Sequence, residues 1–302
     1  MSDIIYENIE IPSFLCEYLR KQYGEIAEKI VTGYTCVRPV TLRINTLKSS
    51  LDEVETELKR LGISFEHVNW YKDALILKEV REDIVRQTTL YRDGKIYLQS
   101  LSSMLPPLYL SPQAGENLLD MTAAPGGKTT ELFALSNGKA LITACEKDKI
   151  RFERLSFNVH TQGAGRVNLL HDDALKLNDF LRFDKILLDA PCSGSGTLNP
   201  FDPVKISEKL IQNCAALQEK LLIKGINLLR KGGILLYSTC SVLAQENEEV
   251  LKRVIGRGGV KLEPISPLSE EISVLPSLEG TICVAPSALY EGFFLAKLVK
   301  IV

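Results

Sequence analysis

The stretch LLDMTAAPGGKTTEL, residues 118–132, decides the fold. It joins a continuous apolar run to an amphipathic run through a turn of small residues that contains Gly126 and Gly127. Only small residues let backbone amides approach a ligand closely, and the start of a helix favours a carboxylate or a phosphate there. The stretch therefore predicts a buried strand, a ligand-binding turn and a helix.

The same order of strand and helix continues after residue 117. Continuous apolar runs that end in polar residues are typical of strands buried on both faces. Such runs predict strands at 118–121, 141–146, 185–191 and 234–240. Apolar residues at three- and four-residue intervals predict helices in KTTELFALS, DKIRFERLSFNVHTQG and a long run from Pro203, with Gly163 and Gly232 as stop signals. We expect an α/β fold with a Rossmann-like parallel sheet and EGFFLAKLVKIV as a last, antiparallel strand.

The first hundred residues follow another pattern, with two helical stretches over about 12–31, a strand in VTLRIN and a helix in LDEVETELKRLG. Shorter strands are predicted around FEHVNWY and ALILK. These elements predict a small N-terminal α+β domain over residues 1–97, followed by the larger domain over 98–302. No Pro/Gly/Ser linker lies at the join near 96–103, so we expect the two domains to pack tightly.

The composition is that of a globular protein, with 302 residues, 45% of them hydrophobic, and a formal net charge of -2. No apolar run approaches the roughly 20 residues of a membrane span, and the N-terminus lacks the basic and apolar regions of a signal peptide. The seven cysteines include no C-x-x-C pair, so we expect no metal site. We therefore expect a cytoplasmic protein, and a monomer.

Nucleic acid binding is neither indicated nor excluded by that net charge, because a local basic face can still neutralise phosphates. Residues of the small domain that would form such a face are Arg38, Arg43, Lys48, Lys59 and Arg60. A solvated surface of mixed charge explains the same residues.

Two common nucleotide-binding motifs fail in this sequence. Gly127-Lys128-Thr129 imitates the end of a phosphate-binding P-loop, but Thr122 stands where the first glycine belongs. Gly194 and Gly196 begin a dinucleotide-binding pattern, but Asn199 stands where the third glycine belongs. The sequence therefore disfavours a nucleoside triphosphatase.

Acidic residues follow the predicted strands at the carboxyl end of the sheet, where ligands bind in folds of this kind. Glu146 ends the second strand, where an acid accepts hydrogen bonds from ribose hydroxyls. Asp173, in HDDAL, lies at the equivalent end of the third strand, where it would meet an adenine amino group. Together with the glycine turn, these acids predict an adenosine-containing ligand.

Two cysteines follow neighbouring predicted strands, Cys192 in DAPCSGSGT and Cys240 in STCS. Carboxyl ends of parallel strands meet at one edge of a sheet, so both thiols and Asp189 are expected beside one pocket. Their polar, backbone-exposing neighbours suit a thiolate better than a buried apolar side chain. The pattern indicates nucleophilic chemistry and leaves open which thiol attacks.

These motifs resemble the Sun (Fmu/RsmB) family of RNA cytosine-5 methyltransferases, which use S-adenosylmethionine on a Rossmann-like class I methyltransferase domain. The resemblance runs from TLRINTLK through YLQSLSSMLPPLYL, AAPGGKT, DAPCSGSG, YSTCS and ENEEV to GFFLAKL and so covers most of the chain. It implies transfer of a methyl group from S-adenosylmethionine to carbon 5 of a cytosine in ribosomal or transfer RNA.

The resemblance also implies roles for individual residues. Asp189 would face the reacting base and also border the cofactor, with Glu146 at the ribose and Asp173 at the adenine. The remaining cofactor-binding residues would be Ala123, Ala124, Pro125, Gly126, Gly127, Lys128 and Arg151. Carbon 5 of cytosine is a poor nucleophile until a thiolate adds to carbon 6, and covalent catalysis supplies that activation.

The two families of cytosine-5 methyltransferases imply different nucleophiles. Analogy with the DNA enzymes, which attack with a Pro-Cys thiol, would select Cys192. The RNA family attacks with the cysteine of the TCS motif, and the full series of motifs matches that family, so we assign attack to Cys240 and product release to Cys192. Two other functions stay open: a DNA cytosine-5 methyltransferase, and a non-catalytic ribosome assembly factor that binds S-adenosylmethionine.

Overall fold

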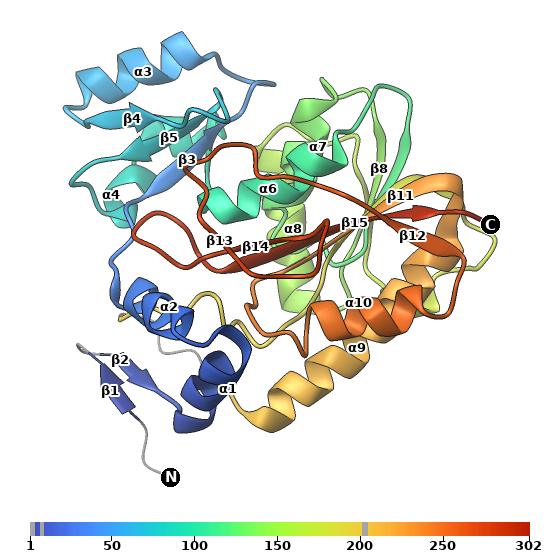
Figure 1. Ribbon diagram of the computed structural model, residues 1–302. Helices are drawn as coiled ribbons and strands as arrows, with labels where there is room; N and C mark the ends of the chain where they lie inside the picture. Colours follow the sequence, from blue (N-terminus) through green and yellow to red (C-terminus); the bar gives the residue numbers. More distant parts are fainter. Residues whose placement is uncertain (1–3, 7–8, 201–204) are drawn as a thin grey trace.

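The computed structural model describes residues 4–6, 9–200 and 205–302, which form two sheets, a short hairpin and the helices around them (Figure 1). The strands of the larger sheet are β7 (Asn117–Asp120), β8 (Leu141–Cys145), β9 (Asn168–Leu170), β10 (Phe183–Asp189), β11 (Leu229–Thr239), β12 (Val260–Glu263), β13 (Val274–Leu275), β14 (Ile282–Val284) and β15 (Phe293–Lys300). Their order is β13-β14-β15-β11-β10-β7-β8-β9, and β12 also pairs with β15.

One half of this sheet is parallel and the other half is antiparallel. Strands β9, β8, β7, β10 and β11 run parallel, whereas β15 pairs with β11 in the antiparallel direction. The predicted α/β class and the predicted last antiparallel strand are therefore confirmed. The chain builds β7, β8 and β9 to one side and then crosses to β10 and β11 on the other, so the order reverses between β7 and β10.

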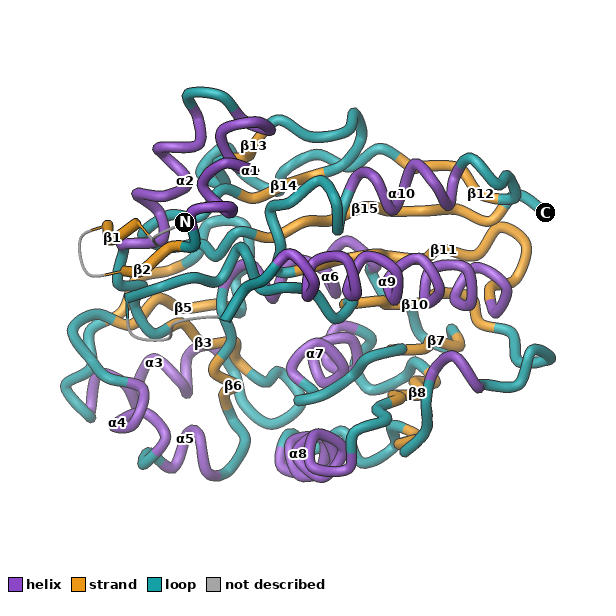
Figure 2. Tube along the Cα trace, turned by 90° about the horizontal axis from the view of Figure 1, so that it is seen from below, coloured by secondary structure: helices purple, strands orange, loops and turns teal. Residues whose placement is uncertain are grey.

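Helices cover both faces because alternate residues of each strand point to opposite sides. On β11, Leu235 and Tyr237 pack in one core and Leu236 packs in the other. The first core contains side chains of α1 (Ser13–Tyr23), α2 (Ile26–Thr35), α9 (Glu208–Leu228) and α10 (Glu248–Ile255). The second contains side chains of α6 (Leu101–Leu110), α7 (Gly127–Leu135) and α8 (Lys149–Thr161). Figure 2 shows α10 alongside β12 and α8 near β8.

The smaller sheet has the antiparallel order β4-β5-β3-β6 and confirms the expected α+β unit. Its elements are β3 (Thr41–Ile44), α3 (Leu51–Arg60), β4 (Phe65–His67), β5 (Ala74–Leu77), α4 (Glu82–Arg86), α5 (Thr89–Arg92) and β6 (Ile96–Leu98). Helix α3 begins with a capping box, in which Ser50 and Glu53 each accept a backbone N–H of the other. A separate apolar core that includes Leu42, Leu58 and Leu75 holds this unit together.

Helices α1 and α2 pack in the core of the larger sheet and not in that of the smaller one. Leu15 and Tyr34 share a cluster with Leu235 and Tyr237 of β11. Gly33 approaches so closely that a Cβ there would lie 2.1 Å from the carbonyl oxygen of Pro286. The antiparallel hairpin of β1 (Ile4–Tyr6) and β2 (Ile9–Ile11) precedes these helices. The proposed division of the chain at residue 97 stays a prediction.

One predicted helix end is wrong. Helix α9 ends at Leu228 and β11 begins at Leu229, so Gly232 lies inside the strand with φ of 77°. This glycine lies in a shift of register, because the pairing advances five residues on β11, from Leu229 to Ile234, and only two on β10, from Phe183 to Lys185. Gly163, in contrast, follows the end of α8 as predicted. The predicted start of α9 at Pro203 lies outside the described residues, and α9 itself begins at Glu208.

Among the helices in the described part of the chain, none has the length and apolar character needed to cross a membrane.

Candidate active site

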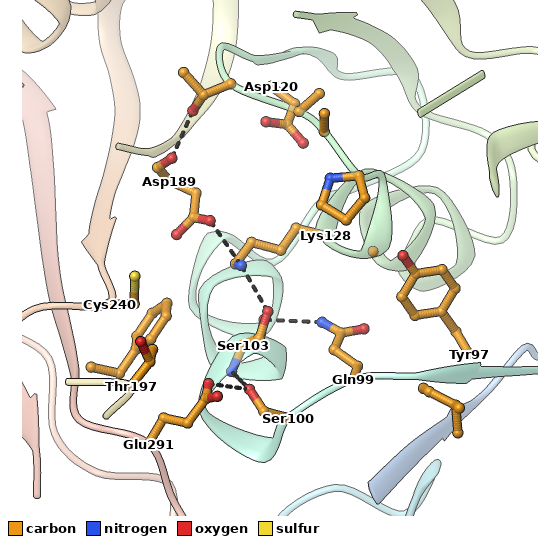
Figure 3. Close-up of a pocket in the computed structure, with 17 residues that line it drawn as sticks. Tyr97, Gln99, Ser100, Ser103, Asp120, Lys128, Asp189, Thr197, Cys240 and Glu291 are labelled. Carbon is orange, nitrogen blue, oxygen red and sulfur yellow. Dashed lines mark hydrogen bonds and ion pairs between the residues drawn. The ribbon is translucent and has the colours of Figure 1, made fainter. Parts of the chain in front are cut away.

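A cavity of about 500 Å³ opens at the carboxyl ends of β7, β10 and β11 (Figure 3). This is the edge of the sheet where the strand order reverses, the usual ligand site in folds of this kind. Asp120, Asp189 and Cys240 come from these three strand ends. The other lining residues are Tyr97, Leu98, Gln99, Ser100, Ser103, Thr122, Ala123, Ala124, Pro125, Gly127, Lys128, Thr197, Glu291 and Phe293. Because Tyr97 and Leu98 belong to β6, the smaller sheet forms part of the wall.

The two cysteines of the sequence motifs are in contact. The Sγ atoms of Cys192 and Cys240 are 2.9 Å apart, although the residues are 48 positions apart in sequence. Both side chains are half-buried, and Cys240, but not Cys192, is among the residues that line the cavity. The hydrogen bond with Cys240 and burial together raise the pKa of Cys192 well above its ordinary value. Cys192 therefore keeps its proton at neutral pH, and Cys240 is the thiol that lines the cavity.

Asp189 and Lys128 form an ion pair beside the thiols, with 2.9 Å between Lys128 Nζ and Asp189 Oδ2. Ser238 donates a hydrogen bond of 2.7 Å to the other oxygen of Asp189. Lys128 also donates to Ser103 Oγ at 2.7 Å, as Figure 3 shows. Burial opposes the charge on Lys128, but the neighbouring carboxylate of Asp189 outweighs it and raises the pKa of Lys128. The cavity thus holds a fixed cation and a carboxylate next to a thiol.

The turn after β7 has no room for larger side chains at Gly126 and Gly127. Gly126 has φ of 108°, and a Cβ on Gly127 would lie 2.8 Å from the ring of Tyr97. Asp120 is buried beneath the turn, and its Oδ2 accepts a hydrogen bond of 2.7 Å from Thr129. Its Oδ1 has no hydrogen-bond partner within the described structure. Burial, reinforced by the charge of Asp189, raises the pKa of Asp120 to about 7.

Glu146 and Asp173 lie outside the residues that line this cavity, at the ends of β8 and β9. The two strand ends are adjacent, because the Glu146 N–H donates to the carbonyl of Leu170. Glu146 is buried, and its Oε1 accepts the N–H of Asp148. Asp173 caps the short 3₁₀ helix η1 (Ala174–Lys176) by accepting the N–H of Leu175.

Arg151 connects Glu146 to the turn after β7. Its Nη2 donates to the carbonyl of Ala124 at 2.9 Å, and its Nη1 lies 3.8 Å from Glu146 Oε2. The predicted cofactor-binding residues therefore lie along one continuous edge of the sheet, from β10 through β7 and β8 to β9.

The predicted basic face of the small domain is wrong for Arg43, which is fully buried. Its Nη2 donates to the carbonyl of Gly127 and to Thr130 Oγ1, and its Nε lies 3.7 Å from Glu131 Oε2. Arg43 thus joins β3 to α7 and offers no charge to a nucleic acid. A sequence motif does not distinguish an exposed arginine from one buried between two units.

The other members of that face also have partners. Arg38 donates to the carbonyls of Tyr290 and Gly33, and Lys48 donates to those of Asp93 and Thr161. Lys59 and Arg60 form ion pairs with Glu55 and Glu57 of their own helix.

Sequence reasoning assigned no role to several residues of the cavity wall. Ser100 donates to Glu291 Oε2 at 2.7 Å, and Phe293 lies under Lys128, whose Nζ is 5.5 Å from the ring centroid. Three of the lining residues belong to stretches that match the family: Ser100 and Ser103 lie in YLQSLSSMLPPLYL, and Phe293 lies in GFFLAKL. That match could have indicated them from the sequence.

Comparisons with known proteins agree with this geometry. A family model described as 16S rRNA methyltransferase RsmB/F matches residues 107–299. A second model, described as the ferredoxin-like domain of RsmF/B-like methyltransferases, matches residues 11–82.

Three relatives illustrate the range of the similarity. The ribosomal RNA small subunit methyltransferase F of Shewanella loihica is 37% identical over 282 residues, which cover 88% of this chain and 58% of the relative. The human 28S rRNA (cytosine(4447)-C(5))-methyltransferase is 35% identical over 87% of this chain and 34% of its own length. The solved structure of NSun6 from Pyrococcus horikoshii with SFG has a TM-score of 0.87 and 26% identity, covering 96% of this chain and 98% of that one.

This chain therefore spans 58% of the length of the Shewanella relative that it matches. The first family model alone covers more than half of the chain, and its matched region includes both cysteines, Lys128 and Asp189. The expected family is confirmed: the chain belongs to the RsmB/F methyltransferase family.

Proposed function

We propose that this protein is an RNA (cytosine-5)-methyltransferase that uses S-adenosylmethionine. The observation that carries the proposal is the pair of thiols at the ends of adjacent parallel strands, with 2.9 Å between the two sulfur atoms and Cys240 in the cavity wall. Cytosine carbon 5 needs a nucleophile on carbon 6 before it can accept a methyl group, and a second group near the adduct must take the carbon 5 proton before the enzyme is released. A pair of thiols beside one cavity supplies both groups.

Cys240 is the proposed nucleophile and Cys192 the proposed release residue. Cys240 lines the cavity, whereas Cys192 lies behind it and keeps its proton because its pKa is raised. The Cys240 thiolate adds to carbon 6 and forms the covalent adduct. After methyl transfer, the carbon 5 proton must pass to a base as the bond between carbon 6 and the Cys240 sulfur breaks, and Cys192 is the proposed base. Once Cys240 is bound to carbon 6, its thiol no longer raises the pKa of Cys192, so Cys192 gives its own proton to solvent. The Cys192 sulfur then takes the carbon 5 proton, and Cys240 leaves as a thiolate.

Asp189 and Lys128 are proposed to activate the base. Addition of a thiolate to carbon 6 places negative charge on the ring, and a proton shared with N3 stabilises that charge. The Asp189 carboxylate is fixed from two sides, by Ser238 and by Lys128. Lys128 holds its proton next to Asp189 because its pKa is raised, so the pair can deliver positive charge or a proton to N3.

The residues at this edge of the sheet fit S-adenosylmethionine. The unpartnered Oδ1 of Asp120 can accept a hydrogen bond from an amino group, and the turn at Ala123 to Lys128 excludes larger side chains next to it. Glu146 and Asp173, at the ends of β8 and β9, would hold the ribose and adenine, and Arg151 would fix the turn through Ala124. The cofactor, when bound, supplies an activated methyl group.

RNA is the proposed substrate class. The names of the Shewanella and human relatives specify ribosomal RNA, and the human name specifies cytosine carbon 5. Those names support a ribosomal RNA target, with transfer RNA as the other target class. A DNA enzyme would attack with Cys192, the thiol that is not part of the cavity wall. A non-catalytic assembly factor would have no use for two thiols in contact.

The test is to trap the covalent adduct. Tagged Cys192→Ala and Cys240→Ala proteins are expressed in the native host and purified under denaturing conditions, and any attached nucleic acid is sequenced. We expect RNA on Cys192→Ala only, because that variant forms the bond to carbon 6 and cannot release it. The attached sequence then identifies the RNA and the cytosine.

Three other results would contradict parts of the proposal. RNA on Cys240→Ala only would reverse the roles of the two thiols. DNA in place of RNA would establish the alternative substrate. Cofactor binding without adduct or methyl transfer in any preparation would favour the assembly factor.

A further inference from the structure

Glu246 lies in the loop between β11 and α10, at the start of the stretch ENEEV, residues 246–250. Its side chain is fully buried and contacts the two residues that immediately follow the thiols in sequence. Oε1 accepts the backbone N–H of Ser193 at 2.7 Å, and Oε2 accepts the hydroxyls of Ser193 at 2.5 Å and Ser241 at 2.7 Å. One carboxylate therefore links the Cys192 loop to the Cys240 loop.

A second set of hydrogen bonds reinforces this link. The hydroxyls of Ser195 and Ser241 are 2.8 Å apart, and the N–H of Gly196 donates to the carbonyl of Cys240 at 2.9 Å. Asn247, next to Glu246, accepts from Thr239 Oγ1 and donates to the carbonyl of Ser241. The residues on both sides of Cys240 are thus fixed by neighbours in the loop after β11.

The buried carboxylate of Glu246 indicates that this residue does more than fill space in the core. A buried carboxylate loses its hydration, and an apolar side chain of similar size often fills such a position at no cost in stability. Burial raises the pKa of Glu246, and its bonds with Ser193 and Ser241 oppose that rise. Glu246 is not among the residues that line the cavity, so it does not contact a substrate there. Its negative charge also contributes to the raised pKa of Cys192.

We infer that Glu246 is a positioning residue that holds the two thiols in contact for the covalent step. This inference rests on the proposed function, since it assigns Glu246 to the same site. The reason for such a residue is geometric: a displacement of about 1 Å at a reacting group can cost about 100-fold in rate. Glu246 Oε2 accepts the hydroxyls of both Ser193 and Ser241, so one atom joins the two residues that directly follow the thiols.

The test compares Glu246→Gln with Glu248→Gln. Glu248 is a matched control, because it is also a buried carboxylate of the same stretch but accepts from Ser277, away from the thiols. For Glu246→Gln we expect kcat for methyl transfer to fall about 100-fold, with the KM for RNA unchanged within about threefold. Glu248→Gln should retain the kcat of the unaltered protein.

A second readout needs no RNA and no cofactor. The reagent 2,2′-dithiodipyridine oxidises two neighbouring thiols to one disulfide and is itself reduced to two pyridinethiones. The rate at which Cys192 and Cys240 become linked, followed by mass spectrometry of the joined peptides, reports how closely the two sulfurs are held. We expect this rate to fall about tenfold or more in Glu246→Gln and to stay unchanged in Glu248→Gln. Ser193→Ala and Ser241→Ala, which keep the carboxylate, should show intermediate rates.

The outcomes separate this inference from the proposed function. Unchanged kcat and an unchanged linking rate in Glu246→Gln would overturn the positioning role, as would equal losses in both glutamate variants. A preparation that transfers no methyl group to any RNA would contradict the proposed function, and the linking rates would still decide the role of Glu246. If Glu246→Gln does not fold, the two serine variants decide it, and linking rates equal to that of the unaltered protein in both would overturn the inference.

Discussion

Two ion pairs involve residues of the same helix, α7, that are three positions apart, and the two pairs face different surroundings. Lys128 pairs with Asp189 in the wall of the cavity, and Glu131 lies 3.7 Å from Arg43 between the two sheets. The Asp189 side chain is 29% exposed, whereas the side chains of Arg43 and Glu131 are 1% and 0% exposed. The first pair can meet a ligand and the second cannot.

The difference shows that charge type and spacing alone do not define a site. Both pairs combine a cation and a carboxylate, and both are surrounded by hydrogen-bonding side chains: Ser103 and Ser238 for the first pair, Gln99 for the second. Burial raises the pKa of Glu131 to about 7, although Arg43 and Gln99 oppose the rise. The Arg43–Glu131 pair, here the closed pair, joins β3 of the smaller sheet to α7. The Lys128–Asp189 pair, here the open pair, lies in the cavity wall.

The largest effect is expected at the open pair. Asp189→Asn should lower the rate of methyl transfer about a thousandfold, because it removes the carboxylate that shares a proton with the base. The midpoint of thermal unfolding should change little, since the amide oxygen of asparagine can accept from Lys128 while its NH2 group donates to the Ser238 hydroxyl. Single-turnover methylation of the trapped RNA measures the rate, and calorimetry measures the midpoint.

Asp184→Asn is the matched control for that variant. Asp184 lies on the same strand, β10, but near its opposite end, where it pairs with Arg230 and accepts the N–H of Asn117. Its loss should leave the rate of methyl transfer unchanged. Equal rates for the two variants would show that the open pair has no special role.

A smaller effect, on stability and not on rate, is expected at the closed pair. The pKa of Glu131 is about 7 in the folded protein against 4.5 for an ordinary glutamate, so between these values the folded state binds more protons than the unfolded state. The contribution of Glu131 to the free energy of unfolding should therefore be fully present below pH 4.5 and be lost as the pH rises through 7. Glu131→Gln removes this component, which amounts to about 2–3 kcal/mol.

Urea unfolding at pH 5 and pH 8 measures this component as a difference between the two proteins. The raised pKa of Asp120 is present in both of them and cancels in that difference. If the free energies of the unaltered protein and Glu131→Gln changed in parallel with pH, Glu131 would titrate normally, and the prediction would be contradicted.

The sequence predicted the large fold well because its strands and helices alternate with clear periodicity. It also predicted the neighbouring thiols, because Cys192 and Cys240 follow two strands that proved to be adjacent and parallel. It placed Arg43 wrongly, because TLRIN has the same letters whether its arginine faces solvent or another unit. The contribution of β6 to the cavity, through Tyr97, depends on how the two sheets pack, and no local pattern encodes that.

The smallest effect is expected at a third kind of ion pair, on the surface of α3. Lys59 pairs with Glu55 at 3.3 Å, its side chain is 67% exposed, and the helix LDEVETELKR has four acidic and two basic residues. Such a surface repels phosphate, so Lys59→Ala should leave unchanged the slope of log K for RNA against log salt concentration. Fluorescence anisotropy of a labelled single-stranded RNA at several salt concentrations measures that slope. A slope reduced by about 0.7 would mean that Lys59 neutralises one phosphate, and α3 would then belong to the RNA-binding face after all.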